Sequence, residues 1–363
     1  MSNFASLIFY LISFSVAVSL IGYGIKRGYR AAIGIGLAIP IIISSLRFDV
    51  GTDYLSYLQI FNSISDISIN EFIRDYSASY ELGVYLIAKF SSLFPYAQNI
   101  YFGIFATGTI LFTYLGLKRY KLPHVWVILF LYLLILFPMS FNLVRQMLAV
   151  SIFFYATSFI QYSKFLKFTI LIVLAALFHK SVIVLLPVYF VGKALPSSRI
   201  LRNQTLVITI LMFLLFIVLG KFTTEYILDL TFFEKYDKYQ VASQASAGVL
   251  LATKIATLGI ITIFMKNINE YKHFAFFYVM GVFEVLILVL AINSVDLSRF
   301  SIYFSIFPII LITYVASSFN RSGRFVIFPV MLMYAISFFW ITYLLKGGSE
   351  IFPYQIMLQK VSL

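Results

Sequence analysis

The sequence contains no cysteine and very few charged residues. Of its 363 residues only 11% are Asp, Glu, Lys or Arg, whereas 61% are hydrophobic, and the mean hydropathy is +0.96. Soluble domains have about a quarter charged and about half apolar residues, so this composition excludes an ordinary soluble domain. The absence of cysteine excludes a disulfide framework and leaves no information about the redox compartment. Apolar residues fall in blocks of about 20, the length that spans a bilayer core. The sequence therefore predicts an all-α polytopic membrane protein.

The motifs of soluble enzymes are missing as well. There is no Walker loop, no dinucleotide fingerprint, no Gly-x-Ser-x-Gly and no metalloprotease helix motif. A net charge of +13 could suggest nucleic acid, but in a membrane protein the distribution of charge among the loops matters more. We expect no nucleic-acid partner and no cofactor. Without repeats or low-complexity tracts, residues 1–363 are predicted to form a single integral membrane domain.

Twelve apolar segments are predicted to form membrane-spanning helices. Their ranges are 4–25, 31–46, 97–117, 123–139, 143–161, 165–178, 181–193, 203–220, 250–266, 273–293, 300–317 and 324–345. No charged side chain precedes the first segment, so we interpret it as a span and not as a signal peptide. The sequence "FHKS" around His179 interrupts an otherwise continuous apolar run.

The positive charges predict the orientation of these helices. With the N-terminus outside, fifteen of the 27 Lys and Arg residues fall in or beside the inner loops, against one acid, Glu270. The fifteen are Lys26, Arg27, Arg30, Lys118, Arg119, Lys121, Lys164, Lys167, Lys193, Arg199, Arg202, Lys266, Lys272, Arg321 and Arg324. This bias places both termini outside. A single span over 165–193 would put every later loop on the wrong side, which supports the break at His179.

Three longer segments are then predicted on the outer side, at 47–96, 221–249 and 346–363. The first contains "YELGVYLIAKFSSLF", whose apolar residues recur at helical spacing and predict an amphipathic helix.

The unusual charged residues converge on this outer side. They are Arg47, Asp49, Asp53, Glu81, Arg145, His179, Lys180, Asp296 and Arg299. Arg145, Lys180 and Arg299 lie at predicted outward-facing helix N-termini, with Asn142 as the expected cap beside Arg145. A cation there is unfavourable by about 0.3–1 kcal/mol. Because free N–H groups and a guanidinium together bind phosphate well, we predict a site for a phosphorylated ligand.

Several of these cations have a structural alternative. Arg47 at a helix C-terminus could complement the helix dipole and extend to lipid headgroups. Arg145 could form a structural ion pair with an outer acid. Arg299 could pair with Asp296, three residues earlier on the same face.

The other ionisable residues also leave alternatives open. His179 could be an interfacial, hydrogen-bonded residue. Asp49 and Asp53 are four residues apart and could bind a metal, but this spacing is common and no further ligands accompany it, so no metal is predicted. Glu284, inside the predicted helix 273–293, could relay protons or could be a protonated, hydrogen-bonded side chain.

Six blocks of sequence resemble the EpsG family of polysaccharide polymerases, which is similar to the Wzy-type O-antigen polymerases. They are "RFDVGTDYLSYLQIF" (47–61), "ELGVYLIAKF" (81–90), "FNLVRQMLAVSIFFYA" (141–156), "LAALFHKSVIVLLP" (174–187), "SRFSIYF" (298–304) and "FPYQIM" (352–357). The blocks occur in family order. Residues 203–297 match poorly, so the outer segment 221–249 is expected to carry substrate specificity.

The resemblance implies a glycosyltransferase of the GT-C type in the bacterial inner membrane. It would transfer a growing glycan from undecaprenyl diphosphate to a sugar hydroxyl of another lipid-linked repeat unit at the outer face. The lipid-linked oligosaccharide would be both donor and acceptor, and a chain-length regulator protein is a further expected partner. The positions that match the family's motifs are Arg47, Gly51, Asp53, Glu81, Arg145, Gln146, His179 and Arg299.

These residues can be given roles in such a transfer. Arg145 and Arg299 would stabilise the diphosphate leaving group, assisted by Arg47 or Lys180. Histidine titrates near neutral pH, so His179 is the first choice of base.

The remaining residues have supporting or alternative roles. Asp53 and Glu81 are the alternative bases. Asp49, Gln146, Asp296 and Tyr354 are expected to shape the site, and Gly51 to permit a tight turn.

Three other functions compete with this hypothesis. A flippase for lipid-linked oligosaccharide would bind the same diphosphate, but it should place ionisable groups through both leaflets. An O-antigen ligase would use the same donor with another acceptor. A membrane acyltransferase is disfavoured because the single outer histidine has no acid beside it in the sequence.

Overall fold

The computed structural model describes residues 1–195, 244–268, 271–291 and 295–356. These residues form helices joined by short connections, with one isolated β-bridge between Arg47 and Ile356 and no β-strand among them, which confirms the predicted all-α class. The chain divides into two compact units, residues 1–189 with 326–363 and residues 190–325. The predicted span 203–220 and most of the outer segment 221–249 lie outside the described residues.

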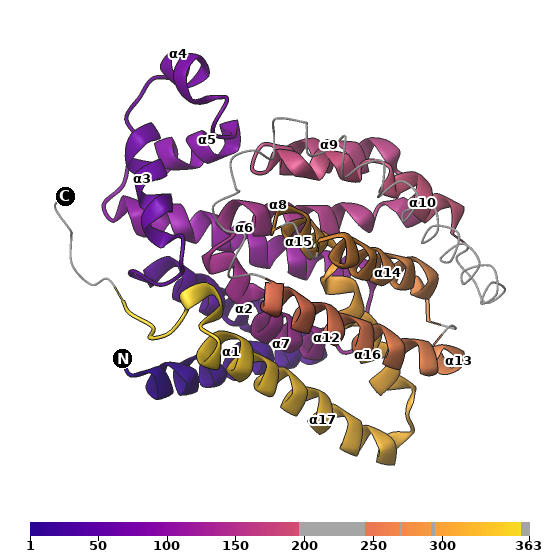
Figure 1. The fold of residues 1–363 in the computed structure, drawn as a ribbon. Helices are drawn as coiled ribbons and strands as arrows, with labels where there is room; N and C mark the ends of the chain where they lie inside the picture. The colour runs from indigo at the N-terminus through magenta and orange to yellow at the C-terminus, as the bar shows by residue number, and fades with distance from the viewer. Residues whose placement is uncertain (196–243, 269–270, 292–294, 357–363) are drawn as a thin grey trace. The chain divides into compact units, whose positions relative to one another are not determined.

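The first unit contains most of the described helices (Figure 1). They are α1 (Asn3–Arg27), α2 (Arg30–Leu46), α3 (Tyr54–Ile64), α4 (Ile69–Glu71), η1 (Phe72–Tyr76), α5 (Leu82–Ser91), α6 (Ala97–Tyr120), α7 (Val125–Ile135), η2 (Phe137–Phe141), α8 (Val144–Thr157), η3 (Ile160–Tyr162), α9 (Phe165–Ala176), η4 (Lys180–Leu185), η8 (Trp340–Leu345) and η9 (Gly348–Glu350). Helices α10 (Val188–Ala194) and α17 (Arg321–Phe339) cross the boundary between the two units.

The second unit is built from α12 (Gln244–Ile263), α13 (Met265–Ile268), α14 (Phe274–Leu290), α15 (Val295–Ser301), η7 (Ile302–Phe304) and α16 (Ile306–Ser318). Helix α14 packs against α12, α15 and α16.

Close helix packing in the first unit depends on small residues. A Cβ atom added to Gly116 of α6 would lie 2.6 Å from the Phe154 ring of α8, so only glycine allows this approach. Polar side chains join the same two helices, since the hydroxyl of Thr113 donates a hydrogen bond to Ser151 at 3.1 Å. Helix α6 therefore lies firmly against α8 and brings its N-terminal end to the start of that helix.

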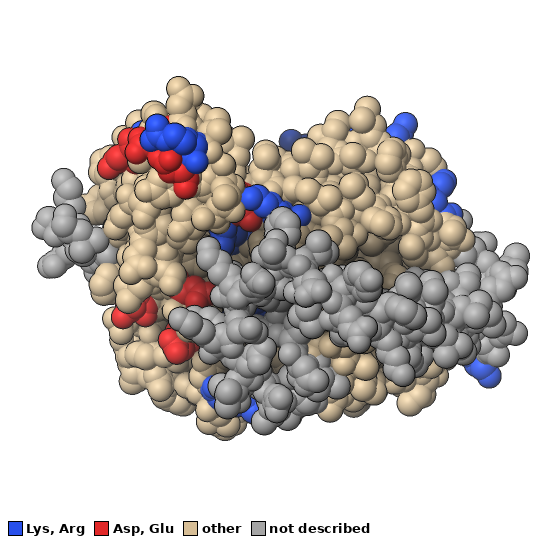
Figure 2. Space-filling view, turned by 45° about the horizontal axis from the view of Figure 1, so that its top comes forward, with Lys and Arg blue, Asp and Glu red and all other residues tan. Residues whose placement is uncertain are grey.

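Only part of the predicted set of spans has the length to cross a bilayer. Within the described residues three helical segments are long and apolar enough, namely Asn3–Arg27, Ala97–Tyr120 and Arg321–Leu345. Leu297–Phe304 and Ile306–Ser318 would make a fourth as one span bent by 40°. The other apolar helices are shorter, at 10–17 residues. Figure 2 shows that uncharged residues form most of one face, with Lys, Arg, Asp and Glu in small groups. These features are those of a membrane protein.

The predicted boundaries agree with the structure at some places and differ at others. The break at His179 is present, because α9 ends at Ala176 and η4 begins at Lys180. The predicted amphipathic helix is α5. The predicted start of a helix at residue 300 is wrong: α15 begins at Val295, and the bend comes later, at Ser305. Residues 296–304 contain no glycine or proline that would end the helical segment before the bend at Ser305.

Candidate functional site

The chain turns sharply between α2 and α3. Gly51 has φ 109°, a conformation that side chains with a Cβ rarely adopt, and an added Cβ would lie 2.6 Å from the carbonyl oxygen of Phe141. The predicted tight turn at Gly51 is confirmed. Asp49 also has a positive φ, of 50°, and its side chain is exposed. The turn therefore presses the backbone of the 47–53 loop against η2.

The C-terminal tail holds this loop from the other side. The backbone N–H of Phe48 donates to Gln355 O, and that of Gly51 to Glu350 O, both at 3.0 Å. Tyr354 is buried, and its hydroxyl donates to Ile43 O at 2.8 Å. The tail is therefore attached both to the loop, through backbone hydrogen bonds, and to the end of α2, through the Tyr354 hydroxyl.

Arg47, directly after α2, lies in an aromatic cage. Its side chain is fully buried, and Cζ lies 4.5 Å from the ring centre of Phe102, 4.6 Å from Phe141 and 6.0 Å from Tyr54. None of its three side-chain nitrogen atoms has a hydrogen-bond partner among the described residues. Burial lowers the pKa of Arg47 to about 10. The headgroup-binding alternative is therefore wrong for this residue, because the guanidinium is enclosed by rings.

Asp53 lies at the end of the same loop, where α3 begins. Its backbone N–H donates to the Asn142 side-chain oxygen at 3.3 Å. Asn142 was expected to cap α8, which is wrong: the N-cap is Leu143, without a side-chain cap bond. The Asn142 side chain is used to hold the loop instead. In the described part of the chain no group of three or more His, Cys, Asp or Glu gathers around Asp49 and Asp53 to hold a metal.

Three charged or titratable side chains from three different elements meet beside this loop. Glu81 is the N-cap residue of α5, Arg145 lies in the first turn of α8, and His179 is the N-cap residue of η4. The Arg145 Nη1 atom donates to Glu81 Oε2 at 2.6 Å, and the other carboxylate oxygen lies 3.9 Å from His179 Nδ1. The exposed fractions of the side chains are 10% for Glu81, 20% for Arg145 and 29% for His179. The cluster is thus shielded from solvent but still open to a ligand.

Gly83 allows this convergence. Its N–H donates to Leu177 O at 2.8 Å, and an added Cβ would lie 2.5 Å from the same oxygen and 2.7 Å from the Phe178 ring. The start of α5 can therefore close onto the end of α9, which brings Glu81 to His179. The sequence "ELG" could have indicated this contact, because a glycine two residues after a cap permits a close backbone approach.

Sequence reasoning missed two tyrosines of this region. The side chain of Tyr57, from α3, is a hydrogen-bonding and electrostatic neighbour of Arg145, and it also faces the charge of Arg47. Tyr101, from α6, is fully buried near Arg145 and Glu81, and its hydroxyl has no hydrogen-bond partner among the described residues. With twenty-six tyrosines in the chain, composition and spacing could not single out these two.

Two further predicted residues lie near the same elements. Lys180 follows His179, is exposed, and donates from Nζ to Ser77 O at 3.2 Å. Gln146 follows Arg145 and is buried. Lys180 is therefore at the rim of the cluster, whereas Gln146 belongs to the packed start of α8.

Arg299 and Asp296 belong to the second unit. Both lie on α15, with Arg299 in its last turn. The expectation that Arg299 marks a helix N-terminus is wrong, because the helix begins before it. In a last turn the helix dipole favours a cation.

The second unit also contains a buried ion pair. Glu284 of α14 is 1% exposed, and one of its oxygen atoms contacts both Lys254 of α12 and the hydroxyl of Ser305. The other oxygen, Oε2, has no partner among the described residues. Ser305 stands at the bend between η7 and α16, so Glu284 is attached to the point where this helical segment changes direction.

The arrangement in the first unit can carry out two kinds of chemistry. Arg145 keeps a buried Nε without a partner among the described residues, which suits a phosphate oxygen. Glu81 lies where it can orient the His179 imidazole and favour a proton on Nδ1, which would leave Nε2 as a base. The ion pair that was the structural alternative for Arg145 is confirmed, with Glu81 as its acid.

A family comparison agrees with this geometry. The model of the EpsG family matches residues 31–356, nearly the whole chain. The chain belongs to the EpsG family. The sequence resemblance is thereby confirmed, and EpsG-like proteins are similar to Wzy-type polymerases. No curated protein and no solved structure matches the chain.

The EpsG match includes every element of the first-unit site. It begins at the second residue of α2 and ends at Ile356 in the docked tail, so the Gly51 turn, the Arg145–Glu81–His179 cluster and the tail contacts all lie inside it. EpsG membership suggests a membrane glycosyltransferase or polymerase-like role in polysaccharide biosynthesis.

Proposed function

We propose that this EpsG family protein is a polysaccharide polymerase of the bacterial inner membrane. It transfers a growing glycan from undecaprenyl diphosphate to a sugar hydroxyl of another lipid-linked repeat unit. The observation that carries this proposal is the convergence of Arg145, Glu81 and His179 from three elements, partly shielded from water, in a chain of this family. An enzyme that separates a diphosphate from a sugar needs a cation for the leaving group and a base for the acceptor, and this cluster offers both.

The proposed reaction forms one bond, breaks one bond and transfers one proton. The acceptor hydroxyl oxygen forms a bond to the anomeric carbon of the donor, and the bond from that carbon to the diphosphate oxygen breaks. The hydroxyl proton passes to Nε2 of His179, and undecaprenyl diphosphate leaves with the bonding electron pair. Glu81 orients the imidazole and stabilises its protonated form.

Positive charge on the protein stabilises the leaving diphosphate. Arg145 is the principal cation, because it is held in place by Glu81 and sits in a site of low dielectric. Lys180 at the rim can approach a phosphate from the side of His179. Arg47 adds positive charge to the same region, since Tyr57 interacts electrostatically with both arginines.

Charge distribution supports the proposed orientation. Lys26, Arg27, Lys118 and Arg119 lie in the last turns of α1 and α6, whereas the cluster lies beside the opposite ends of α2 and α6. With the basic ends in the cytoplasm, both termini and the cluster face outward. We further propose a GT-C-like arrangement of the helices and a chain-length regulator as a partner protein.

Reconstitution tests the proposal directly. The purified protein is placed in vesicles with lipid-linked repeat units extracted from cells that lack it, and glycan length and released undecaprenyl diphosphate are measured. We expect a ladder of longer glycans, reduced at least about 100-fold by Arg145→Ala. Arg74→Ala is the matched control, since Arg74 is exposed and paired with the adjacent Asp75. A normal ladder with folded Arg145→Ala protein would remove the diphosphate role.

A transporter is the second candidate, and one observation favours it. The buried Lys254–Glu284 pair joins two apolar helices of the second unit, and ionisable pairs inside membrane helices often mark transport paths. The same vesicles distinguish the two functions. Movement of the labelled lipid between leaflets without glycan growth would indicate a flippase, whereas growth without any added partner indicates a polymerase. Transfer to a different acceptor only would indicate a ligase.

A further inference from the structure

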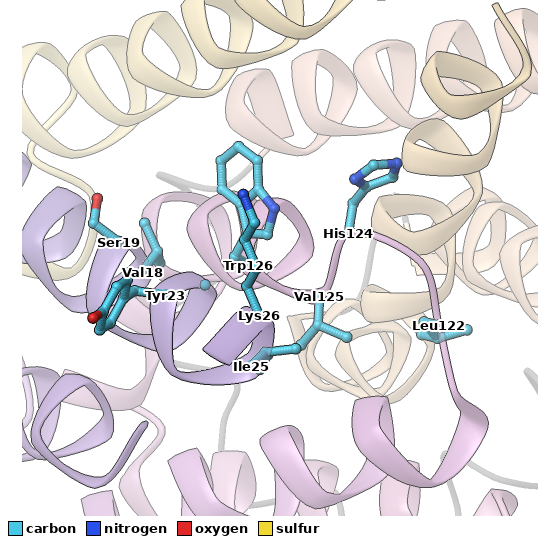
Figure 3. A pocket seen from close by; sticks show the side chains of 10 residues that line it. Val18, Ser19, Tyr23, Ile25, Lys26, Leu122, His124, Val125 and Trp126 are labelled. Carbon is cyan, nitrogen blue, oxygen red and sulfur yellow. The ribbon is translucent and has the colours of Figure 1, made fainter. Parts of the chain in front are cut away.

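A cavity of about 530 Å³ lies far from the cluster, at the other end of α1. Figure 3 shows side chains of the C-terminal part of α1 and of residues 122–126, which lead into α7 and form its first turn. Helix α1 has 25 residues, and its N-terminal end contacts the tail through Met1 and Tyr354. A helix of this length is about 37 Å long, so the cavity and the tail-bound loop lie at opposite ends of the unit.

One part of the cavity wall is apolar. Val18 and Ile25 come from α1, Leu122 comes from the segment before α7, and Val125 is the first residue of α7. Helix α1 is among the helices long and apolar enough to span a membrane, and only 33% of its most apolar 18-residue window is buried inside the protein. Ile25 is 45% exposed, whereas Val18 and Leu122 are buried, so an acyl chain that enters the cavity would meet apolar side chains.

The other part of the wall has the character of a membrane interface. Lys26 is exposed in the last turn of α1, and Trp126 and Tyr23 are 41% and 52% exposed. Aromatic residues with a polar edge are typical of the headgroup level, and a lysine there reaches phosphate groups. An added Cβ on Gly22 would lie 3.3 Å from Trp126 Cγ, so this glycine lets the indole lie directly against α1.

The charged side chains in and beside the cavity are basic. None of the residues that line it is acidic, and residues 1–48 and 82–224 contain no Asp or Glu at all. Within the first unit the acids lie at residues 49–81 and at Glu350, beside the tail-bound loop. Lys26 therefore has no carboxylate from the segments that form its own wall, and the neighbouring Arg27 and Lys121 add to the positive potential.

We propose that this cavity binds an anionic phospholipid of the surrounding bilayer, with its phosphate beside Lys26 and Trp126 and an acyl chain along Val18 and Val125. Charge selects the anionic headgroup, and the apolar wall selects a lipid over a free anion. The site is independent of the proposed polymerase reaction.

The test uses delipidated protein in detergent. Phosphatidylglycerol, phosphatidylcholine or inorganic phosphate is added, and bound lipid is counted by native mass spectrometry while the unfolding temperature is measured. Of the three ligands, we expect only phosphatidylglycerol to bind the protein and to raise its unfolding temperature. Lys26→Gln should weaken its binding about fivefold, because one basic residue near a lipid surface contributes about 1 kcal/mol. Ser19→Phe, at an exposed position on the wall, should fill the cavity and abolish binding.

Lys118→Gln is the matched control, since Lys118 is equally exposed in the last turn of α6 and does not line the cavity. The proposal is overturned if phosphatidylcholine binds as well as phosphatidylglycerol, or if Lys118→Gln weakens binding as much as Lys26→Gln. Stabilisation by inorganic phosphate alone would show that the cavity takes a small anion, which also overturns the lipid assignment.

Discussion

Arg145 and Glu81 are 64 positions apart in the chain, yet the Arg145 Nη1 atom lies 2.6 Å from Glu81 Oε2. Each residue begins a different helix, so the contact joins the start of α8 to the start of α5. The same carboxylate faces His179 across 3.9 Å, which is too long for a hydrogen bond and short enough for a strong electrostatic effect. Structural support and proposed catalysis therefore depend on one carboxylate, and the experiments below separate them.

The first prediction concerns the energetic coupling of this pair. Removing one partner of a shielded ion pair leaves the other charge without compensation, which costs on the order of 3 kcal/mol. We expect Glu81→Ala and Arg145→Ala each to lower the unfolding temperature, and the double variant to be little worse than either. Thermal unfolding in detergent measures the cycle. The exposed Arg74–Asp75 pair, treated in the same way, should show no resolvable coupling. Additive effects at Glu81 and Arg145 would mean that the contact does not hold the two helices together.

The second prediction concerns proton transfer. A base must be neutral to accept a proton, so we expect polymerisation to fail on the acid side as the His179 imidazole becomes protonated. The negative Glu81 carboxylate favours the imidazolium form, so in Glu81→Gln the acid limb of the pH–rate profile should move to lower pH. His179→Gln should remove that limb together with most of the activity. An acid limb that stays in place in His179→Gln would assign the base to Asp53 or Glu81.

Much of this site could be predicted from the sequence, because rare residues are informative in an apolar chain. Three predicted residues, Glu81, Arg145 and His179, are brought together, and the break at His179 followed from loop charges. The sequence alone could not decide the role of Arg145, because the same arginine could form an ion pair with an acid or bind a phosphate. The fold shows the ion pair with Glu81, and the phosphate role of Arg145 stays a proposal.

Other parts could not be predicted, for physical reasons. Tyr57 is one of many tyrosines, and its position beside Arg145 depends on how α3 packs. Arg47 was expected to assist in diphosphate binding, with contact to headgroups as the alternative, and neither predicts its cage, which is formed by rings distant in sequence, Phe102 and Phe141. Arg299 was placed at a helix start because the continuous apolar run begins there, whereas α15 starts earlier, with the mixed sequence "VDLS".

The third prediction uses two glycines of the first unit. Gly51→Ala should strongly destabilise the protein, because the residue has φ 109° and its new Cβ would lie 2.6 Å from Phe141 O. We expect a loss of at least about 1–3 kcal/mol from the backbone strain alone. Gly34→Ala is the matched control: Gly34 lies inside α2 with open space around it, and alanine there should stabilise by up to about 1 kcal/mol. Unfolding temperatures that move in the same direction for both variants would contradict the assigned turn.

The fourth prediction concerns the caged Arg47. Burial lowers the pKa of Arg47 below its usual value, to about 10, so the folded protein still holds a charged guanidinium at neutral pH but pays a desolvation cost for it. The difference corresponds to about 3 kcal/mol of destabilisation, partly offset by the surrounding rings. This destabilisation is present in full at pH values below about 10 and decreases as the pH rises above that value. Arg47→Met, which fills the cage without charge, should therefore raise the unfolding temperature.

The polymerisation activity of Arg47→Met should fall, although its unfolding temperature rises. A buried charge without a hydrogen-bond partner lowers stability, and such a cost is typical of a functional residue. We expect a more stable protein that makes a shorter glycan ladder. Arg47→Lys keeps the charge but loses ring stacking, so it should be less stable than the wild type while it retains part of the activity. A stabilised Arg47→Met variant with a normal ladder would remove Arg47 from the proposed site.

The fifth prediction concerns the second unit, where Glu284 contacts Lys254 and the hydroxyl of Ser305. Lys254→Met should destabilise by about 3–5 kcal/mol, because it leaves a buried carboxylate without its cation. Lys254→Met combined with Glu284→Leu should restore most of that loss, since a well-packed apolar pair replaces both charges. Ser305→Ala should have a smaller effect, of about 1–3 kcal/mol, as one hydrogen bond is removed.

The activity of the restored Lys254→Met/Glu284→Leu double variant then decides what the pair does. A structural pair that fixes the bend at Ser305 predicts normal glycan polymerisation, because the bend persists when the packing is restored. A proton-relay or transport role for Glu284 predicts a stable but inactive protein, because leucine cannot take up a proton. We expect the first result, since the carboxylate is already bound by Lys254 and Ser305 at the bend.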